Sequence, residues 1–158
     1  MASYAPLFGH VDGWQWSPDL IWVDNLHVYG TPSYHVQKLY SLYKGTDIIP
    51  IKRDGQNVTG QDSIYASAIY DAEAKELIIK LVNYNDKPVA ANFQLDTKKK
   101  VRGDATKITL ANESLDVVNS IEEPLKIQPN TQQINYKGKV IADTFPPYSF
   151  TVIKVGVQ

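Results

Sequence analysis

Hydrophobic and polar positions follow two patterns along the chain, and the change falls near Gly45. Residues 20–23 form a continuous apolar run bounded by Asp19 and Asp24. A run of this length is typical of a parallel strand buried on both faces, as in an α/β barrel. Residues 63–70 instead alternate, which is typical of antiparallel strands with one face in water. The two patterns predict two different structural units.

A helix is predicted over residues 31–45. Thr31 is a good N-cap, and Pro32 suits the first helical position, where its missing N–H costs no hydrogen bond. Gly45 suits a C-terminal cap. An apolar stripe with the spacing of a helix face is formed by Val36, Leu39, Tyr40 and Tyr43. At the N-terminus, residues 1–8 are predicted to be the end of a helix that leads into a loop.

Beyond the helix, the chain predicts about eight short strands separated by turn residues. They span residues 48–52, 63–71, 76–83, 89–95, 105–110, 115–119, 132–136 and 148–155. The pattern is weaker at 121–127 and 139–143, and Pro124 and Pro129 favour edge or loop positions there. Many short strands without helices predict an antiparallel, jelly-roll-like β-sandwich.

Composition excludes several classes of function. The chain has 158 residues, no cysteine and a formal net charge of −1. Without cysteine there are no disulfides and no thiolate metal sites or nucleophiles. The interspersed charges indicate no nucleic acid and no membrane as partners. His10, His27 and His35 lack metal-site spacing, so we expect no metal and no cofactor.

A specific resemblance is carried by residues 4–8 (YAPLF), 13–25 (GWQWSPDLIWVDN) and 29–39 (YGTPSYHVQKL). In order and content these segments resemble the C-terminal part of an α-L-arabinofuranosidase of glycoside hydrolase family 51. Residues 146–152 (PPYSFTV) resemble the last strand of that family.

The resemblance implies a (β/α)₈ catalytic barrel followed by a C-terminal sandwich. Residues 1–45 would then be the terminal strand and helix of a truncated barrel, and residues 46–158 the sandwich. The expected fold is therefore mainly β, preceded by a leftover βα unit. Having lost both barrel neighbours, residues 1–27 would be poorly anchored and residues 20–23 an exposed edge.

The resemblance also implies hydrolysis of terminal arabinofuranosyl groups from arabinan- or arabinoxylan-type glycans with retention. The two catalytic glutamates of the family lie on earlier barrel strands, so we expect no catalytic residue here and an inactive fragment. A retaining pair needs two carboxyl groups about 5 Å apart. Asp19 and Asp24 lie at opposite ends of one strand, roughly 16 Å apart, and cannot form such a pair.

Four residues are candidates for substrate binding in the intact enzyme. By resemblance, Gln37 contacts the arabinose, and its amide can both donate to and accept from sugar hydroxyls. Asn25 follows the carboxyl end of the barrel-type strand, where barrel active sites collect. Trp14 and Trp16 lie on the preceding loop and could stack on a sugar or cap the barrel end. Trp22 is expected in the core.

The alternative function is a stand-alone, non-catalytic carbohydrate-binding or structural module. It needs a planar aromatic strip, but Tyr65 and Tyr70 are predicted on opposite faces of one strand. The expected partner of the parent enzyme is an arabinose-containing oligo- or polysaccharide. Homo-oligomerisation and localisation stay open.

Overall fold

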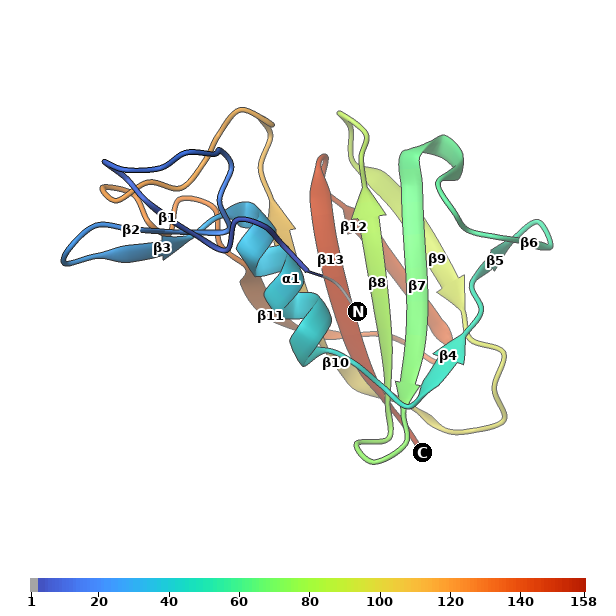
Figure 1. Cartoon of the computed structure of the whole chain (residues 1–158). Coiled ribbons are helices and arrows are strands. Elements are labelled where there is room, and N and C mark those ends of the chain that lie inside the picture. The colour runs from blue at the N-terminus through green and yellow to red at the C-terminus, as the bar shows by residue number, and fades with distance from the viewer. Residues whose placement is uncertain (1–2) are drawn as a thin grey trace.

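The computed structural model describes residues 3–158, and its centre is a sheet of six strands in the order β11-β10-β13-β8-β7-β4 (Figure 1). All neighbouring strands in this sheet run antiparallel. The strands are β4 (Asp47–Ile49), β7 (Ile64–Asp71), β8 (Glu76–Asn83), β10 (Val101–Ala111), β11 (Asn130–Asn135) and β13 (Ser149–Val157). The prediction of a mainly β fold with an antiparallel sandwich is confirmed.

The middle of this sheet is buried on both faces. In β8, Leu77 and Leu81 belong to the core between the sandwich layers. Ile78, with the opposite side-chain direction, belongs to a second cluster on the other face. The outer face of the central strands is therefore out of water, because a helix covers it. In β7, where the sequence predicts one face in water, Tyr65 and Ser67 are exposed.

The second layer of the sandwich has two antiparallel strands, β9 (Val89–Gln94) and β12 (Val140–Phe145). Phe145 is fully buried, and Phe93 meets its ring edge-to-face at a centroid distance of 6.2 Å. A short hairpin of β5 (Lys52–Arg53) and β6 (Gln56–Asn57) lies beside this layer, followed by the 3₁₀ turn η1 (Gln61–Ser63).

The single α-helix of the described residues, α1 (Pro32–Leu42), begins as the sequence predicts. The Thr31 side chain accepts a hydrogen bond from the Tyr34 backbone N–H, and Pro32 occupies the first turn. Its predicted end is wrong, since Tyr43 is the C-cap. Gly45 instead permits a close approach to β7, where an added Cβ would lie 2.6 Å from the Tyr70 carbonyl oxygen.

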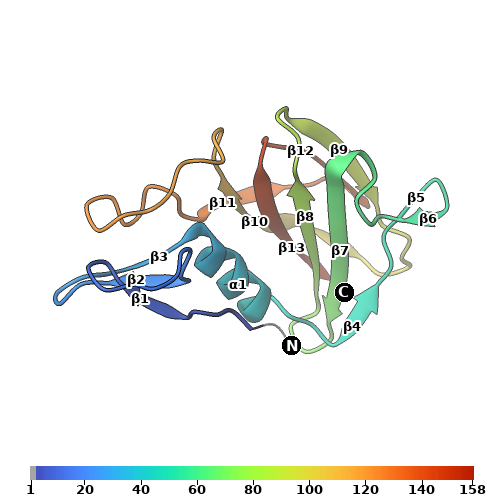
Figure 2. The same ribbon diagram turned by 45° about the horizontal axis from the view of Figure 1, so that its top comes forward.

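Helix α1 covers the outer face of the six-stranded sheet (Figure 2). Its Leu39 is buried in the second cluster with Ile78, Ile108, Phe150 and Val152. Residues on both sides of the predicted boundary at 45/46 thus share one hydrophobic cluster. The division into two domains stays a prediction.

The N-terminal segment forms a three-stranded sheet of β1 (Phe8–His10), β2 (Ile21–Val23) and β3 (Val28–Gly30). β2 is the middle strand, with β1 parallel and β3 antiparallel to it. The expected exposed edge at residues 20–23 is therefore wrong, because the flanking segments supply both partners. The predicted helix end at 1–8 is also wrong over the described residues 3–8, and residues 1–2 lie outside the described range.

The predicted strand at 115–119 is wrong, because these residues form no strand in the structure. Of the two weaker patterns, 121–127 forms no strand, whereas residues 140–143 belong to β12. The irregular loop is held by the buried side chain of Asn119, which donates to the Gly30 and Ile127 carbonyls and accepts from the Ile127 N–H at 2.7–2.9 Å. No helix within residues 3–158 is long and apolar enough to cross a membrane.

Candidate functional site

The turn between β2 and β3 carries Asn25, whose side chain is exposed. Its neighbour Asp24 holds the turn by accepting from the backbone N–H groups of Leu26 and His27. The hydrogen bond from the His27 side chain, followed by these backbone bonds, lowers the pKa of Asp24 to about 2. Asp24 is therefore an anion at neutral pH and cannot serve there as a general acid.

The two loop tryptophans lie between β1 and β2 and are largely exposed, Trp14 to 52% and Trp16 to 69%. Trp14 packs edge-to-face on Trp22 at 6.1 Å between ring centroids. The loop starts at the carboxyl end of β1, and because β1 is parallel to β2, this end lies at the edge that also carries Asn25.

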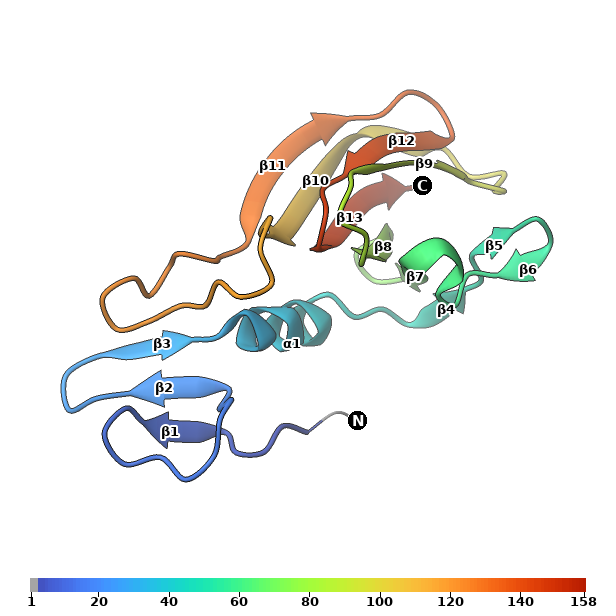
Figure 3. The same cartoon turned by 90° about the horizontal axis from the view of Figure 1, so that it is seen from above.

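Gln37 lies on α1 and is half-buried. Since β3 runs antiparallel to β2, the chain returns to the amino end of β2 before α1 begins, and the Thr31 N–H donates to the Leu20 carbonyl at 3.1 Å. The turn between β2 and β3, which carries Asn25, lies at the end of this sheet away from α1 (Figure 3). The structure thus brings Asn25 and the start of the tryptophan loop to one edge but leaves Gln37 away from them. The substrate-binding roles of all four stay predictions.

Sequence reasoning overlooked the environment of Asp19. This side chain is 2% exposed, and its Oδ1 has no hydrogen-bond partner within residues 3–158. The carboxylate packs against Gly9, where an added Cβ would collide with it. No sequence pattern signals this burial, because the contact with Gly9 comes from a different strand, β1.

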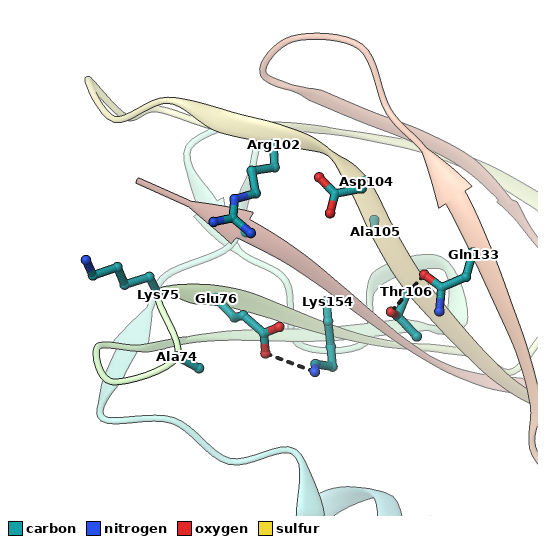
Figure 4. A pocket seen from close by; sticks show the side chains of 10 residues that line it. Ala74, Lys75, Glu76, Arg102, Asp104, Ala105, Thr106, Gln133 and Lys154 are labelled. Atoms are coloured by element: carbon teal, nitrogen blue, oxygen red, sulfur yellow. Dashed lines mark hydrogen bonds and ion pairs between the residues drawn. The ribbon is translucent and has the colours of Figure 1, made fainter.

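A polar pocket of about 100 Å³ lies across β8, β10, β11 and β13 (Figure 4). Its charged side chains are Lys75, Glu76, Arg102, Asp104 and Lys154. Glu76 is paired with Lys154 at 2.9 Å, and Thr106 donates to Gln133 at 3.2 Å. The pocket offers hydrogen bonds to a small polar molecule. Because Glu76 is paired with Lys154, the pocket offers no free pair of carboxylates for glycoside hydrolysis.

An apolar cleft of about 390 Å³ lies beside the first turns of α1, with Tyr84 and Tyr148 among its lining residues. Their rings are 6.2 Å apart and inclined at 71°. Two rings at this angle do not form the planar strip expected of a sugar-binding face.

Comparison with known proteins places these features in a family. Residues 1–149 match the family described as the α-L-arabinofuranosidase C-terminal domain. The chain is 31% identical over 158 residues to α-L-arabinofuranosidase 1 of Arabidopsis thaliana, a match that covers 96% of this chain and 22% of that protein. It is 42% identical over 52 residues to an extracellular exo-α-L-arabinofuranosidase of Streptomyces chartreusis. This match covers 33% of this chain and 6% of that protein.

Solved structures agree with this assignment. An arabinose-bound α-L-arabinofuranosidase of glycoside hydrolase family 51 superposes with a TM-score of 0.87 and 30% identity, over 99% of this chain and 24% of that one. The family 51 enzyme of Thermotoga petrophila, at a TM-score of 0.68 and 20% identity over 86% of this chain and 31% of that one, shares the fold. The chain thus spans less than a third of the length of each of these relatives.

Proposed function

The chain belongs to the family of C-terminal domains of glycoside hydrolase family 51 α-L-arabinofuranosidases, and from this premise we propose that it serves an enzyme that removes terminal arabinofuranosyl groups. The proposed substrates are arabinan- and arabinoxylan-type glycans, cleaved with retention. The observation that carries the proposal is the match of nearly the whole chain to about a fifth of an arabinofuranosidase.

In this proposal, residues 1–45 complete the catalytic barrel and residues 46–158 form the sandwich that supports it. The support is the packing of α1 on the six-stranded sheet, where Leu39 is buried among Ile108, Phe150 and Val152. A helix fixed on both the N-terminal sheet and the sandwich would hold the barrel end against the second domain.

We propose further that residues 1–158 do not hydrolyse glycosides by themselves. A retaining glycosidase needs a carboxylic acid with a raised pKa beside a carboxylate about 5 Å away. Three carboxyl groups of this chain instead have lowered pKa values. The pKa of Asp24 is lowered by hydrogen bonds from His27 and the backbone of its turn, and that of Glu122 by its own backbone N–H and Ser120. The pKa of Asp143 is lowered as well. Glu76 and Glu123 are each paired with a lysine.

An assay with an aryl α-L-arabinofuranoside tests the inactivity. The purified chain is expected to release no phenol above the buffer rate, while an intact family 51 enzyme assayed in parallel gives turnover. Release that co-purifies with the chain and persists after removal of contaminating hydrolases would refute the proposal.

Affinity electrophoresis in arabinan and arabinoxylan gels separates this function from the alternative binding module. We expect the same mobility in gels with and without polysaccharide. Retardation that is relieved by free arabino-oligosaccharides would instead establish a carbohydrate-binding module.

A further inference from the structure

Strand β11 (Asn130–Asn135) is the last strand of the six-stranded sheet, and its outer side has no partner among residues 3–158. In Figure 3 it lies beside β10 at one end of this sheet. All of its residues are exposed except Ile134, which is half-buried. The strand therefore offers an open edge to another polypeptide.

The hydrogen bonds between β11 and β10 show which backbone groups lie on this edge. The Tyr136 N–H donates to the Gly103 carbonyl at 2.8 Å and continues the register of the two strands. In an antiparallel ladder, alternate residues direct both backbone groups to the same neighbour. The even-numbered residues of β11 therefore bond to β10. The outward N–H and C=O groups belong to Thr131, Gln133 and Asn135.

This edge lacks the features that usually prevent pairing, which are short length, charge and proline. β11 has the sequence Asn-Thr-Gln-Gln-Ile-Asn, without charge or proline. By contrast, β4 at the other edge of the sheet is three residues long and begins with Asp47. The lack of charge favours self-pairing, because in a symmetric pair a charge at the centre of the strand would face its own copy.

We propose that two copies of this chain pair through β11 in an antiparallel, two-fold symmetric ladder that joins their six-stranded sheets. One register brings all three outward residues into the ladder. In it, Gln133 faces Gln133 of the second copy, and Thr131 faces Asn135 of the second copy. These pairs exchange about six backbone hydrogen bonds. The dimer is closed, because the same edge is used on both copies and none is left for a third.

The side chains of the outward residues suit this register. They project to the face that carries α1, since Ile108, opposite Thr131 on β10, belongs to the cluster under the helix. The Gln133 Oε1 accepts from the Thr106 hydroxyl at 3.2 Å, which orients the amide and leaves its Nε2 for another acceptor. At the two-fold axis this acceptor is the Gln133 amide of the second copy, and paired amides of this kind stabilise strand ladders.

Sedimentation velocity of the chain from about 5 to 500 µM tests the pairing, because a single ladder is smaller than a standard interface and is expected to be weak. We expect a monomer at the low concentration and a dimer at the high one. Hydrogen exchange gives the register. The amides of Thr131, Gln133 and Asn135 are expected to exchange about tenfold more slowly in the dimer, while the even-numbered amides, already bonded to β10, change little.

Gln133→Lys places two like charges at the two-fold axis and is expected to raise the dissociation constant about tenfold or more. Gln133→Glu is expected to do the same alone, and an equimolar mixture of the two variants is expected to restore the dimer. Thr131→Lys is the matched control, because its charge faces Asn135 of the second copy. It is expected to change the dissociation constant by less than about threefold.

The proposal would be overturned by a monomer at every concentration or by a dimer in which the three outward amides stay unprotected. Equal effects of Gln133→Lys and Thr131→Lys, or assemblies that grow beyond the dimer, would overturn it as well. The pairing does not depend on the reaction of the parent enzyme, so the proposed function is judged separately by its own assays.

Discussion

Asn83 joins three parts of the sandwich through one side chain. It is fully buried at the end of β8, and its Nδ2 donates to the carbonyl oxygens of Lys87, Phe145 and Pro146 at 2.8–3.2 Å. Its Oδ1 accepts from the backbone N–H of Asn85 at 3.0 Å. The amide therefore satisfies polar groups that would otherwise be buried without partners.

Substitution Asn83→Ala is expected to lower the free energy of unfolding by about 3 kcal/mol, because it leaves several buried backbone groups without partners. Urea denaturation followed by far-UV circular dichroism measures this change. Asn92→Ala, on an exposed position of β9, is the control and is expected to change stability by less than about 0.5 kcal/mol. Equal effects of the two substitutions would show that the Asn83 contacts are not stabilising.

Asp143 is the centre of a polar network within the sandwich. Burial alone would raise its pKa, but hydrogen bonds from Lys107 at 2.7 Å, Tyr136 at 2.8 Å and the Thr144 N–H outweigh burial and lower it. Burial and this carboxylate raise the pKa of Tyr136. The Tyr136 phenol therefore remains a donor and Asp143 a charged acceptor at neutral pH.

A carboxyl group whose pKa is lower in the folded than in the unfolded chain stabilises the fold at any pH above its unfolded pKa, near 3.9. This stabilisation is lost as the pH falls through the pKa of the folded state. Asp143→Asn is expected to cost about 3 kcal/mol at pH 7, since it leaves Lys107 without its counter-ion. The difference from wild type should shrink as the pH falls from about 5 to 2. Unfolding free energies across this range measure it, with the exposed Asp96→Asn as control; a constant difference would contradict the account.

Gln37 is the residue to which the family resemblance assigns arabinose contact. In the intact enzyme, Gln37→Ala is expected to lower kcat/KM about tenfold, the effect of losing one or two hydrogen bonds to a sugar hydroxyl. The exposed Gln132→Ala is the control. Unchanged kcat/KM for Gln37→Ala would show that Gln37 does not contact the arabinose and is only a surface residue of α1.

Helix α1 is the element that covers the outer face of the main sheet. Leu39 is 5% exposed, whereas Leu42 on the same helix is 62% exposed. Leu39→Ala is expected to destabilise the chain by about 3 kcal/mol, because it opens a cavity against Phe150 and Val152. Leu42→Ala should cost less than about 1 kcal/mol. Thermal unfolding of the two variants measures the contrast, and similar losses would show that α1 does not pack on the sheet as described.

The elements that local sequence predicted well are those determined by local chemistry. The start of α1 follows from Thr31 and Pro32, and β8 coincides with the predicted strand 76–83. Residues 115–119 have the composition of a strand, but Asn119 ties them to Gly30, which is 89 residues away. β12 lacks a strong alternating pattern and exists because β9 and the buried Phe145 position it. Such long-range partners leave no local signal.

At the scale of the whole molecule, the family motifs concentrate in residues 4–39, while the sandwich fills most of the chain. The motifs identified the family, and the match over residues 1–149 confirms it. For the candidate site, the sequence predicted which residues could bind a sugar but not which of them lie close together. Which of Trp14, Asn25 and Gln37 lie together depends on β3, whose antiparallel return to the amino end of β2 separates α1 from the β2–β3 turn.

The central claim is that this chain acts as the non-catalytic C-terminal domain of a family 51 arabinofuranosidase. Sequencing the source DNA upstream of the Met1 codon tests it most directly. We expect an open frame that continues for the length of a barrel, about 250 residues, with glutamates at the carboxyl ends of two strands. A stop codon and a ribosome-binding site directly ahead of Met1 would contradict the claim and leave the binding or structural module in its place.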